Sequence, residues 1–203
     1  MITIIDYGLG NLRSVQKSFE RAKNKVEISS DLKKIEKAKK LVLPGVGHFG
    51  KGMDNLKSSG LIDILNQKVL LDKVPILGIC LGMQLMTKYS QESNSEGLGW
   101  IDANTIRFEK DITKKFKVPH IGWNSIEVVN DNNLLNKIKN HSQYYFVHTY
   151  YVFCKKKSEV MTESKYGIKF HSSFRKDNVF GVQFHPEKSL SVGLQMLENF
   201  SKI

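Results

Sequence analysis

A cysteine with a glycine two residues to either side is the feature of this sequence that most clearly suggests chemistry. Gly78-Ile79-Cys80-Leu81-Gly82 lies where an apolar run, Val74–Ile79, meets a helical pattern. Glycines at these positions relieve crowding at a sharp strand-to-helix turn, which pushes the middle side chain out at the edge of a sheet. The N-terminus of the following helix favours a reactive thiolate. The pattern predicts that Cys80 is a nucleophile, and the alternative is a buried structural cysteine.

A nucleophilic cysteine requires a base and a group that orients the base. His185-Pro186-Glu187 follows a strand-like segment, Val179–Phe184. In an extended segment residues i and i+2 face the same way, so we expect Glu187 to hold the His185 ring while its other nitrogen faces the thiol. Pro186 keeps the preceding residue extended. Taken alone, the same three residues also fit a turn with an ordinary surface ion pair.

A glycine-rich loop, Gly45–Gly50, follows the strand-like run Lys40–Leu43. Its glycines have the spacing of a dinucleotide-binding loop, but such a loop follows the first strand of its domain and requires an acidic residue after the next strand. This loop follows the third strand. Beside a cysteine elbow it is better interpreted as an oxyanion hole, in which the N–H of Gly47 acts together with the N–H of Leu81.

These segments must be positioned by the elements around them, and the first half alternates strand and helix patterns. Strands are predicted at Ile2–Ile5, Val26–Ile28, Lys40–Leu43 and Val74–Ile79, and helices from Asn11, over Asp31–Ala38, over Lys51–Leu70 with a break near Gly60, and over Leu81–Tyr89. The second half predicts strands at Thr105–Phe108, Ser125–Val129, Tyr144–Phe153, Ile168–Arg175 and Val179–Phe184, then a helix over Ser191–Phe200. This order predicts one α/β domain, residues 1–203, with a doubly wound, mainly parallel sheet and an antiparallel extension.

The composition argues against a nucleic-acid-binding, metal-binding or membrane protein. The 203 residues carry 31 Lys and Arg against 20 Asp and Glu, a net charge of +11. The excess is spread along the chain and is nearly all lysine, without the interleaved aromatics of a nucleic-acid surface, so we expect no nucleic-acid partner. Cys154, His148 and His171 are expected to be packed side chains, with no ligand spacing for a metal. No apolar run reaches the length of a membrane span and no signal peptide is visible, so a cytoplasmic protein without a membrane partner is expected.

Several segments together resemble the class I (triad) glutamine amidotransferases, and within them the glutaminase subunits of imidazole glycerol phosphate synthase. The segments that carry the resemblance are DYGLGNLRSV at 6–15, LPGVGHFG at 43–50, GICLGMQ at 78–84, KVPHIGWNSI at 117–126, YFVHTYY at 145–151 and GVQFHPEKS at 181–189. They extend over nearly the whole chain.

The resemblance implies a function and a set of site residues. It implies a Cys–His–Glu triad of Cys80, His185 and Glu187, and a site with no metal and no cofactor. The substrate glutamine would be held by Gln84, by Glu92, by the Gly47 loop and by the backbone of Thr149 and Tyr150. A (βα)8-barrel cyclase subunit would form a heterodimer with this chain, facing Asn11, Trp123 and Lys188, and would receive the ammonia in histidine biosynthesis.

Two alternatives stay open at this point. A paralogous glutaminase subunit that supplies ammonia to another synthase, such as a surface-sugar amidotransferase, would share these motifs. The more remote alternative is a non-catalytic relative that binds a polyanion through its basic surface, against which the intact triad argues.

Overall fold

The computed structural model describes residues 1–108 and 116–203 of the chain. Its first half alternates strands and helices, as the sequence predicts. The elements are β1 (Ile2–Ile5), α1 (Leu12–Arg21), β2 (Val26–Ser29), α2 (Leu32–Glu36), β3 (Leu41–Gly45), α3 (Phe49–Ser58), α4 (Leu61–Asn66), a π-helical turn (Gln67–Leu71), β4 (Ile76–Cys80) and α5 (Leu81–Leu85).

The second half is built mainly of strands. They are β5 (Tyr89–Ser90), β6 (Ser95–Glu96), β7 (Ala103–Arg107), β8 (His120–Ser125), β9 (Glu127–Val128), β10 (Gln143–His148), β11 (Tyr150–Cys154), β12 (Val160–Tyr166), β13 (Ile168–Lys176) and β14 (Val179–Val182). The chain closes with α7 (Leu190–Lys202), and short 3₁₀ turns occupy Asn133–Leu135, Lys157–Glu159 and Pro186–Lys188. Within residues 1–108 and 116–203, none of the helices has the length and apolar character of a membrane span.

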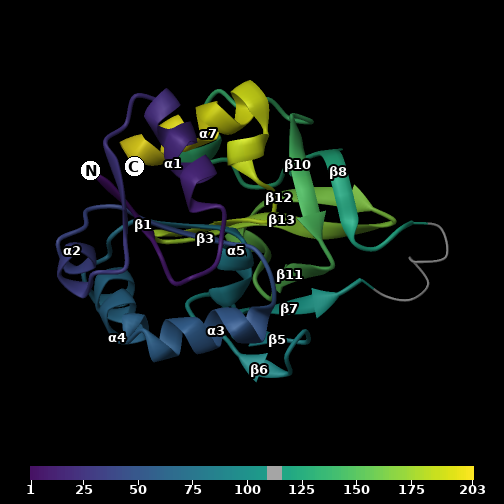
Figure 1. Ribbon diagram of the computed structural model, residues 1–203. Helices are drawn as coiled ribbons and strands as arrows, with labels where there is room; N and C mark the ends of the chain where they lie inside the picture. The colour runs from purple at the N-terminus through teal and green to yellow at the C-terminus, as the bar shows by residue number, and fades with distance from the viewer. Residues whose placement is uncertain (109–115) are drawn as a thin grey trace.

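The main sheet combines a parallel part with an antiparallel part. Its strand order is β2-β1-β3-β4-β14-β13-β11-β7-β5-β6, and β12 pairs with β13. Pairing is parallel from β2 through β14 and antiparallel from β14 through β7. Helices α1 and α7 cover one face of the parallel part, while α3 and α4 cover the other (Figure 1). This arrangement is the doubly wound α/β architecture with an antiparallel extension that the sequence predicts.

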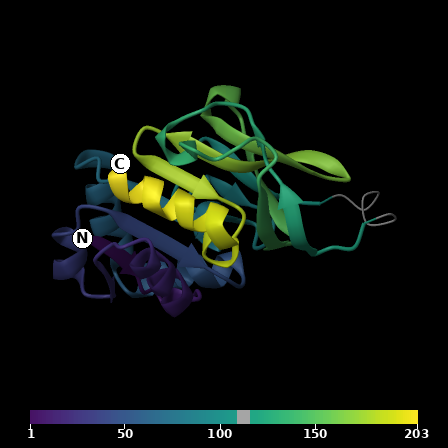
Figure 2. The ribbon, with the colours of Figure 1, turned by 90° about the horizontal axis from the view of Figure 1, so that it is seen from above.

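Each face of the sheet has its own apolar core. On one face Phe19 of α1 packs on Phe200 of α7, with ring centroids 6.4 Å apart. On the other face Leu56 of α3 and Leu61 of α4 join Leu43 of β3, and all three are fully buried. Seen from above, α7 lies along the sheet beside α1 (Figure 2). The rigid layers hold the carboxyl ends of β3, β4 and β14 at one edge.

The strand register brings three chemically important segments together at that edge. Gly45 at the end of β3 lies opposite Cys80 at the end of β4. On the other side of β4, Ile79 lies opposite Val182 of β14, three residues before His185. Residues 45, 80 and 185 are far apart in the sequence, and parallel pairing makes them neighbours.

The predicted strand Tyr144–Phe153 is wrong in one important respect, because the chain divides at Thr149 into two strands in different sheets. β10 pairs with β8 in a separate two-stranded sheet, whereas β11 joins the main sheet between β13 and β7. The aromatic and apolar pattern continues across the division, so periodicity alone does not reveal it. What decides it is the pairing partner of each half.

Other boundaries also differ from the predictions. The helix expected over Leu81–Tyr89 ends at Leu85, because the backbone oxygens of Leu85 and Met86 accept hydrogen bonds from residues 98, 100 and 101 instead of continuing the helix. The strand expected at Ser125–Val129 is two pieces, β8 and β9, which pair with different strands. β12 was not predicted. The break near Gly60 is confirmed, and Gly60 has a left-handed φ of +69°.

Candidate active site

Cys80 lies at a strained turn between β4 and α5. Its φ is +54° and its ψ is −109°, a conformation that a residue with a side chain rarely adopts, and such strain is found mainly at functional positions. The flanking glycines are sterically required. A Cβ on Gly78 would lie 2.8 Å from the Met83 nitrogen, and one on Gly82 would collide with the Leu43 carbonyl oxygen. The turn is therefore the elbow that the glycine spacing predicts.

His185 and Glu187 form a buried pair beside this elbow. The ring Nδ1 of His185 donates to Glu187 Oε1 at 2.7 Å, and both side chains are 2% exposed. The contact is the expected one, but the backbone differs from the expectation: His185 is extended, whereas Pro186–Lys188 forms a 3₁₀ turn. His185 Nε2 is buried without a hydrogen-bond partner among the described residues. Because Nδ1 carries the proton shared with Glu187, Nε2 is the nitrogen left to exchange a proton with Cys80.

The electrostatics of His185 favour its imidazolium form. Burial by itself lowers the pKa of this histidine, but the interactions with the negative charges of Cys80 and Glu187 outweigh burial and raise the pKa to about 10. A protonated ring between a carboxylate and a sulfur is the arrangement that lets a histidine deliver a proton to a leaving group. The geometry supports acid–base chemistry at Cys80.

The second cysteine is in a different environment. Cys154 at the end of β11 is buried, and burial together with Glu159 raises the pKa of its thiol to about 12. Its backbone N–H donates to His171 Nδ1 at 3.0 Å, so His171 is a packed histidine as expected.

We expect a glutamine-like electrophile to modify Cys80 and to leave Cys154 free, because only a thiolate reacts quickly. Peptide mapping after partial labelling of the native protein measures the ratio of the two modified peptides. A Cys154→Ser variant is the control and should keep the labelling rate of the parent. Preferential modification of Cys154 would reverse the assignment.

A cavity of about 330 Å³ opens beside Cys80. Its lining includes the sequence-predicted residues Gly47, Cys80, Leu81, Gln84, Glu92, Thr149 and Tyr150, together with Val46, Pro119, Val147 and His148. A cavity of this volume suits a ligand of the size of an amino acid. The structure therefore brings every predicted oxyanion and substrate-binding residue to one cavity.

The backbone carbonyl of Tyr150 orders one wall of the cavity. It accepts hydrogen bonds from Gln84 Nε2 at 3.0 Å and from His148 Nδ1 at 2.9 Å. His148 Nε2 must then be an acceptor, and it lies 2.9 Å from His120 Nδ1. Burial, the first cause in both histidines, lowers the pKa of His120 to about 4 and that of His148 to about 3. Both rings are neutral near pH 7 and act as a fixed support, so His148 is the packed histidine that the sequence predicts.

Glu92 supports the opposite wall, since its Oε2 accepts the N–H of Phe49 at 2.7 Å. The glycine-rich loop beside it is shorter than Gly45–Gly50, because α3 already begins at Phe49 and Gly50 lies in its first turn. Gly47 has a φ of +112° with open space where a Cβ would be. Leu81 is the first residue of α5, and the N–H of a first helical residue has no partner within the helix.

Tyr7 is a residue near the site that the sequence analysis did not single out. Its hydroxyl is buried and has no hydrogen-bond partner among the described residues, and it occupies the space that a Cβ on Gly45 would need. Burial, and then the charge of Cys80, raise the pKa of this phenol well above its usual value. It is therefore neutral and leaves a buried polar group unsatisfied.

Because an unsatisfied buried hydroxyl is destabilising, we expect Tyr7→Phe to raise the free energy of unfolding by about 1 kcal/mol. Tyr144→Phe is the matched control: Tyr144 is also buried, but its hydroxyl donates to the Val192 carbonyl at 3.3 Å, so this variant should lose stability. Urea denaturation of both variants measures the difference. Equal losses in both would contradict the prediction.

The predicted interface residues occupy two places. Trp123 on β8 is 48% exposed and meets the Tyr145 ring edge-on at a centroid distance of 6.1 Å. Lys188 is exposed, with Nζ 5.6 Å from the centre of the same ring. Asn11 is exposed immediately before α1, and α1 contacts the 3₁₀ turn at Pro186–Lys188, where Ser18 Oγ donates to the Glu187 carbonyl at 3.4 Å. Trp123 and Tyr145 lie opposite each other in the pairing of β8 with β10.

Comparisons with known proteins agree with this geometry. A family model described as glutamine amidotransferase class-I matches residues 3–203. Two relatives from Methanococcus maripaludis, named imidazole glycerol phosphate synthase subunit HisH 2 and HisH 1, are 48% and 43% identical, and each alignment covers 100% of this chain and at least 99% of the relative. A solved structure of PurLQS from Thermotoga maritima has the same fold, with a TM-score of 0.74 at 17% identity over 99% of this chain and 97% of that one. This chain belongs to the class-I glutamine amidotransferase family.

Proposed function

We propose that this chain is the glutaminase subunit of an imidazole glycerol phosphate synthase. The observation that carries the proposal is a cysteine at a strained elbow beside a buried His185–Glu187 pair. Full-length relatives with that subunit name support the choice of synthase. The ammonia would pass to a (βα)8-barrel cyclase, which adds it to phosphoribulosyl-formimino aminoimidazole carboxamide ribotide. The products are imidazole glycerol phosphate and aminoimidazole carboxamide ribotide, within histidine biosynthesis.

The first half-reaction makes a thioester. The Cys80 thiolate attacks the side-chain amide carbon of glutamine, and the carbonyl oxygen takes up the negative charge. Backbone N–H groups of Gly47 and Leu81 stabilise that oxyanion, a contribution worth roughly 3–4 kcal/mol for one donor. His185 gives its Nε2 proton to the amide nitrogen, the carbon–nitrogen bond breaks, and ammonia leaves.

The second half-reaction regenerates the enzyme. His185, now neutral, accepts a proton from a water molecule that attacks the thioester carbon. The carbon–sulfur bond breaks and releases glutamate, the thiolate returns, and His185 is again protonated. Glu187 holds the ring orientation throughout and stabilises the imidazolium. The sum is glutamine plus water giving glutamate plus ammonia.

Substrate glutamine is held along the cavity walls in this proposal. Glu92 and the side chain of Gln84 would bind the polar groups at the α-carbon, and the backbone of Thr149 and Tyr150 would complete the pocket. The hydrogen bond from the Gln84 side chain to the Tyr150 carbonyl supports this assignment, since a pre-ordered wall loses little entropy on binding.

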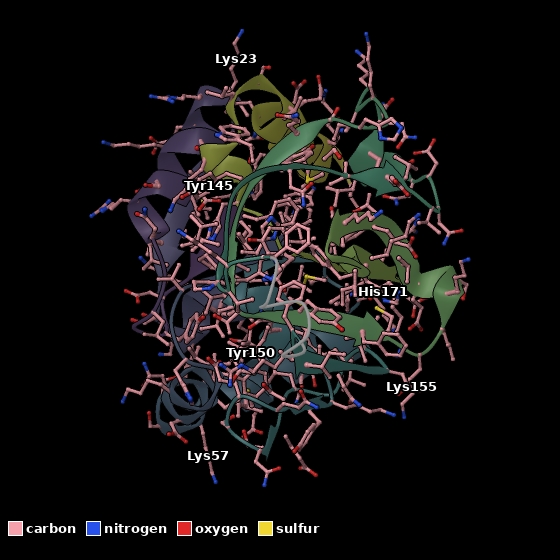
Figure 3. The ribbon with its side chains drawn as sticks, turned by 90° about the vertical axis from the view of Figure 1, so that its right-hand side faces the viewer. Lys23, Lys57, Tyr145, Tyr150, Lys155 and His171 are labelled. Atoms are coloured by element: carbon pink, nitrogen blue, oxygen red, sulfur yellow. The ribbon has the colours of Figure 1, made fainter. Side chains whose placement is uncertain are left out.

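The partner would dock on the surface formed by Trp123, Tyr145 and Lys188. Figure 3 looks onto the side of the molecule that carries β8 and β10, where Tyr145 and Tyr150 are labelled. Two further exposed apolar side chains, Ile121 at 58% and Leu190 at 73%, extend this surface. An exposed apolar patch next to the triad turn suits a protein that delivers ammonia directly to a second active site.

A second candidate differs only in the acceptor of the ammonia. Methanococcus maripaludis has two relatives with the same subunit name, so one organism can carry two such glutaminases. A paralogue that serves another synthase, for example one that aminates a surface sugar, would fit the same site. The polyanion-binding alternative has less support, because the basic residues are spread along the chain, and Lys23, Lys57 and Lys155 point outward at separate parts of the surface (Figure 3). We further propose that residues 1–203 form one domain and that the protein is cytoplasmic.

Activation by the partner tests the function. We expect glutamine hydrolysis to rise at least about tenfold when the cognate cyclase and its ligand are added, which needs only about 1.4 kcal/mol of differential stabilisation between two states of the loop at Gly47. Glycine at this position tolerates the φ change of a peptide rotation. Steady-state hydrolysis by the chain alone, and then titrated with partner, measures the effect.

Substitutions at the proposed interface test whether the activation depends on docking of the partner. Lys188→Ala and Asn11→Ala should weaken the activation while thermal stability stays unchanged, whereas Lys57→Ala, also exposed, should behave as the parent. Full turnover by the isolated chain, unchanged on titration, would contradict the activation. Activation by a different synthase and not by the cyclase would favour the second candidate.

A further inference from the structure

Gln183 is a fully buried side chain that touches the nucleophile and that the mechanism above does not use. It lies between β14 and His185, and its backbone N–H donates to the Ser172 carbonyl at 2.9 Å. Its Nε2 lies 3.8 Å from Cys80 Sγ, within hydrogen-bond distance for sulfur, and its Oε1 accepts from Gln84 Nε2 at 3.1 Å. Both ends of the amide are therefore engaged.

The hydrogen-bond partners of the Gln183 amide determine which end of it faces the sulfur. The Tyr150 carbonyl can only accept, so the end of the Gln84 side chain that faces it must be the NH₂ group. The same nitrogen also faces Gln183, so the facing atom of Gln183 must be its oxygen. The remaining Nε2 of Gln183 then points at the sulfur. A chain of hydrogen bonds from the Tyr150 backbone holds an N–H donor against Cys80.

The second polar neighbour of the Cys80 sulfur is the backbone carbonyl of Val147, which is a hydrogen-bond acceptor, whereas Gln183 presents a donor. Val147 presents its carbonyl oxygen 3.8 Å from Cys80 Sγ, where it can accept from a thiol S–H but cannot stabilise a thiolate. Gln183 can donate to a thiolate whose proton has moved to His185. Hydrogen bonds to a charged acceptor are stronger than neutral ones, and such a bond matters here because Cys80 as a residue is only 7% exposed to water.

We infer that Gln183 is a catalytic residue that donates its side-chain N–H to the Cys80 thiolate and so favours the reactive form of the nucleophile. The inference deepens the proposed glutaminase function and rests on it. It also assigns Gln84 a second role, since Gln84 orients the Gln183 amide through its own NH₂ group.

Alkylation of Cys80 by iodoacetamide tests the donor without requiring glutamine. The rate is measured against pH in the full-length chain, with Cys80 identified by peptide mapping. In Gln183→Met, which removes the donor at similar volume, the midpoint of the rate profile should move up by about one pH unit and the rate at neutral pH should fall about tenfold. In Gln183→Glu, which keeps an acceptor for Gln84 but places a carboxylate oxygen at the sulfur, the shift should be larger.

A control variant and a kinetic readout separate this role from packing. Gln195→Met changes a half-buried glutamine of α7 that bonds Asn199 and should leave the profile unchanged. In the complex with the cyclase, both Gln183 variants should lower glutamine-dependent kcat about tenfold or more, with KM within about twofold and ammonia-dependent synthesis intact. Thermal melting identifies the variants that fold. If Gln183→Met does not fold, the near-isosteric Gln183→Glu provides the test.

Two results would overturn the inference: an unchanged alkylation profile in a folded variant, or a change confined to KM, which would assign Gln183 to substrate binding. Failure of the proposed function gives a different result. In that case the parent chain with its partner would not hydrolyse glutamine, while its alkylation profile would still respond to Gln183.

Discussion

Replacing Cys80 by alanine is expected to abolish glutamine-dependent synthesis, with a fall of at least about 10⁴-fold, and to spare ammonia-dependent synthesis by the partner. The sulfur is the only atom of this chain that bonds to carbon in the proposed mechanism, so no other residue can replace it. The ammonia-dependent reaction uses the partner's active site alone. Product formation by the intact complex, measured with glutamine and then with an ammonium salt, separates the two activities.

Cys154→Ala is the control for this experiment, because Cys154 is equally buried but lies at the end of β11 with a thiol of raised pKa. It should retain the glutamine-dependent rate of the parent. Loss of both activities in an assembled Cys80→Ala complex would show that Cys80 has a role beyond that of the glutaminase nucleophile.

Glu187→Gln is expected to lower glutamine hydrolysis by about 10³–10⁴-fold, the size of effect seen when the carboxylate that orients a catalytic histidine is neutralised. The amide can present its NH₂ group to His185 Nδ1 and so favour the wrong tautomer. The substitution also removes the negative charge of the carboxylate beside the His185 ring. Burial lowers the pKa of this ring, but Cys80 and Glu187 outweigh burial and raise the pKa to about 10. The pKa of His185 should therefore fall in the variant.

The raised pKa of His185 makes the stability of the folded chain depend on pH. Because the native pKa of about 10 exceeds the ordinary 6.5, the imidazolium adds stability that is fully present below about pH 6.5 and is lost as pH rises through about 10. Glu187→Gln should reduce that stability at neutral pH and lower the NMR titration midpoint of His185. Glu198→Gln, a change of a carboxylate paired with Lys202 on the surface, is the control. An unaltered midpoint in Glu187→Gln would contradict the prediction.

Local features of the site could be predicted from the sequence because they depend on near neighbours in the chain. The elbow at Cys80 requires small residues at positions 78 and 82, and glycines stand there. His185 and Glu187 are two residues apart, so many local conformations bring their side chains together; the contact forms although the turn differs from the extended segment expected. The alternation of strands and helices up to Cys80 follows equally local patterns.

Other features were decided only by the tertiary structure, since they depend on which strands pair. The division of Tyr144–Phe153 at Thr149 follows from β8 pairing with one half and β7 and β13 with the other. That division exposes the Tyr150 carbonyl to Gln84 and His148. The surface of Trp123 and Lys188 around Tyr145 likewise depends on the pairing of β8 with β10.

At Cys80 the local conformation and the surroundings of the side chain have different origins. The glycine spacing predicts that Cys80 is presented at a turn, but nothing local predicts which groups meet its sulfur. His185 and Gln183 reach it because β14 pairs in parallel with β4, and Gln183 is oriented through Gln84 by a carbonyl 33 residues before it in the chain, at Tyr150. Backbone conformation is set by neighbouring residues, whereas hydrogen-bond partners in a buried site are set by the packing of strands that are distant in sequence.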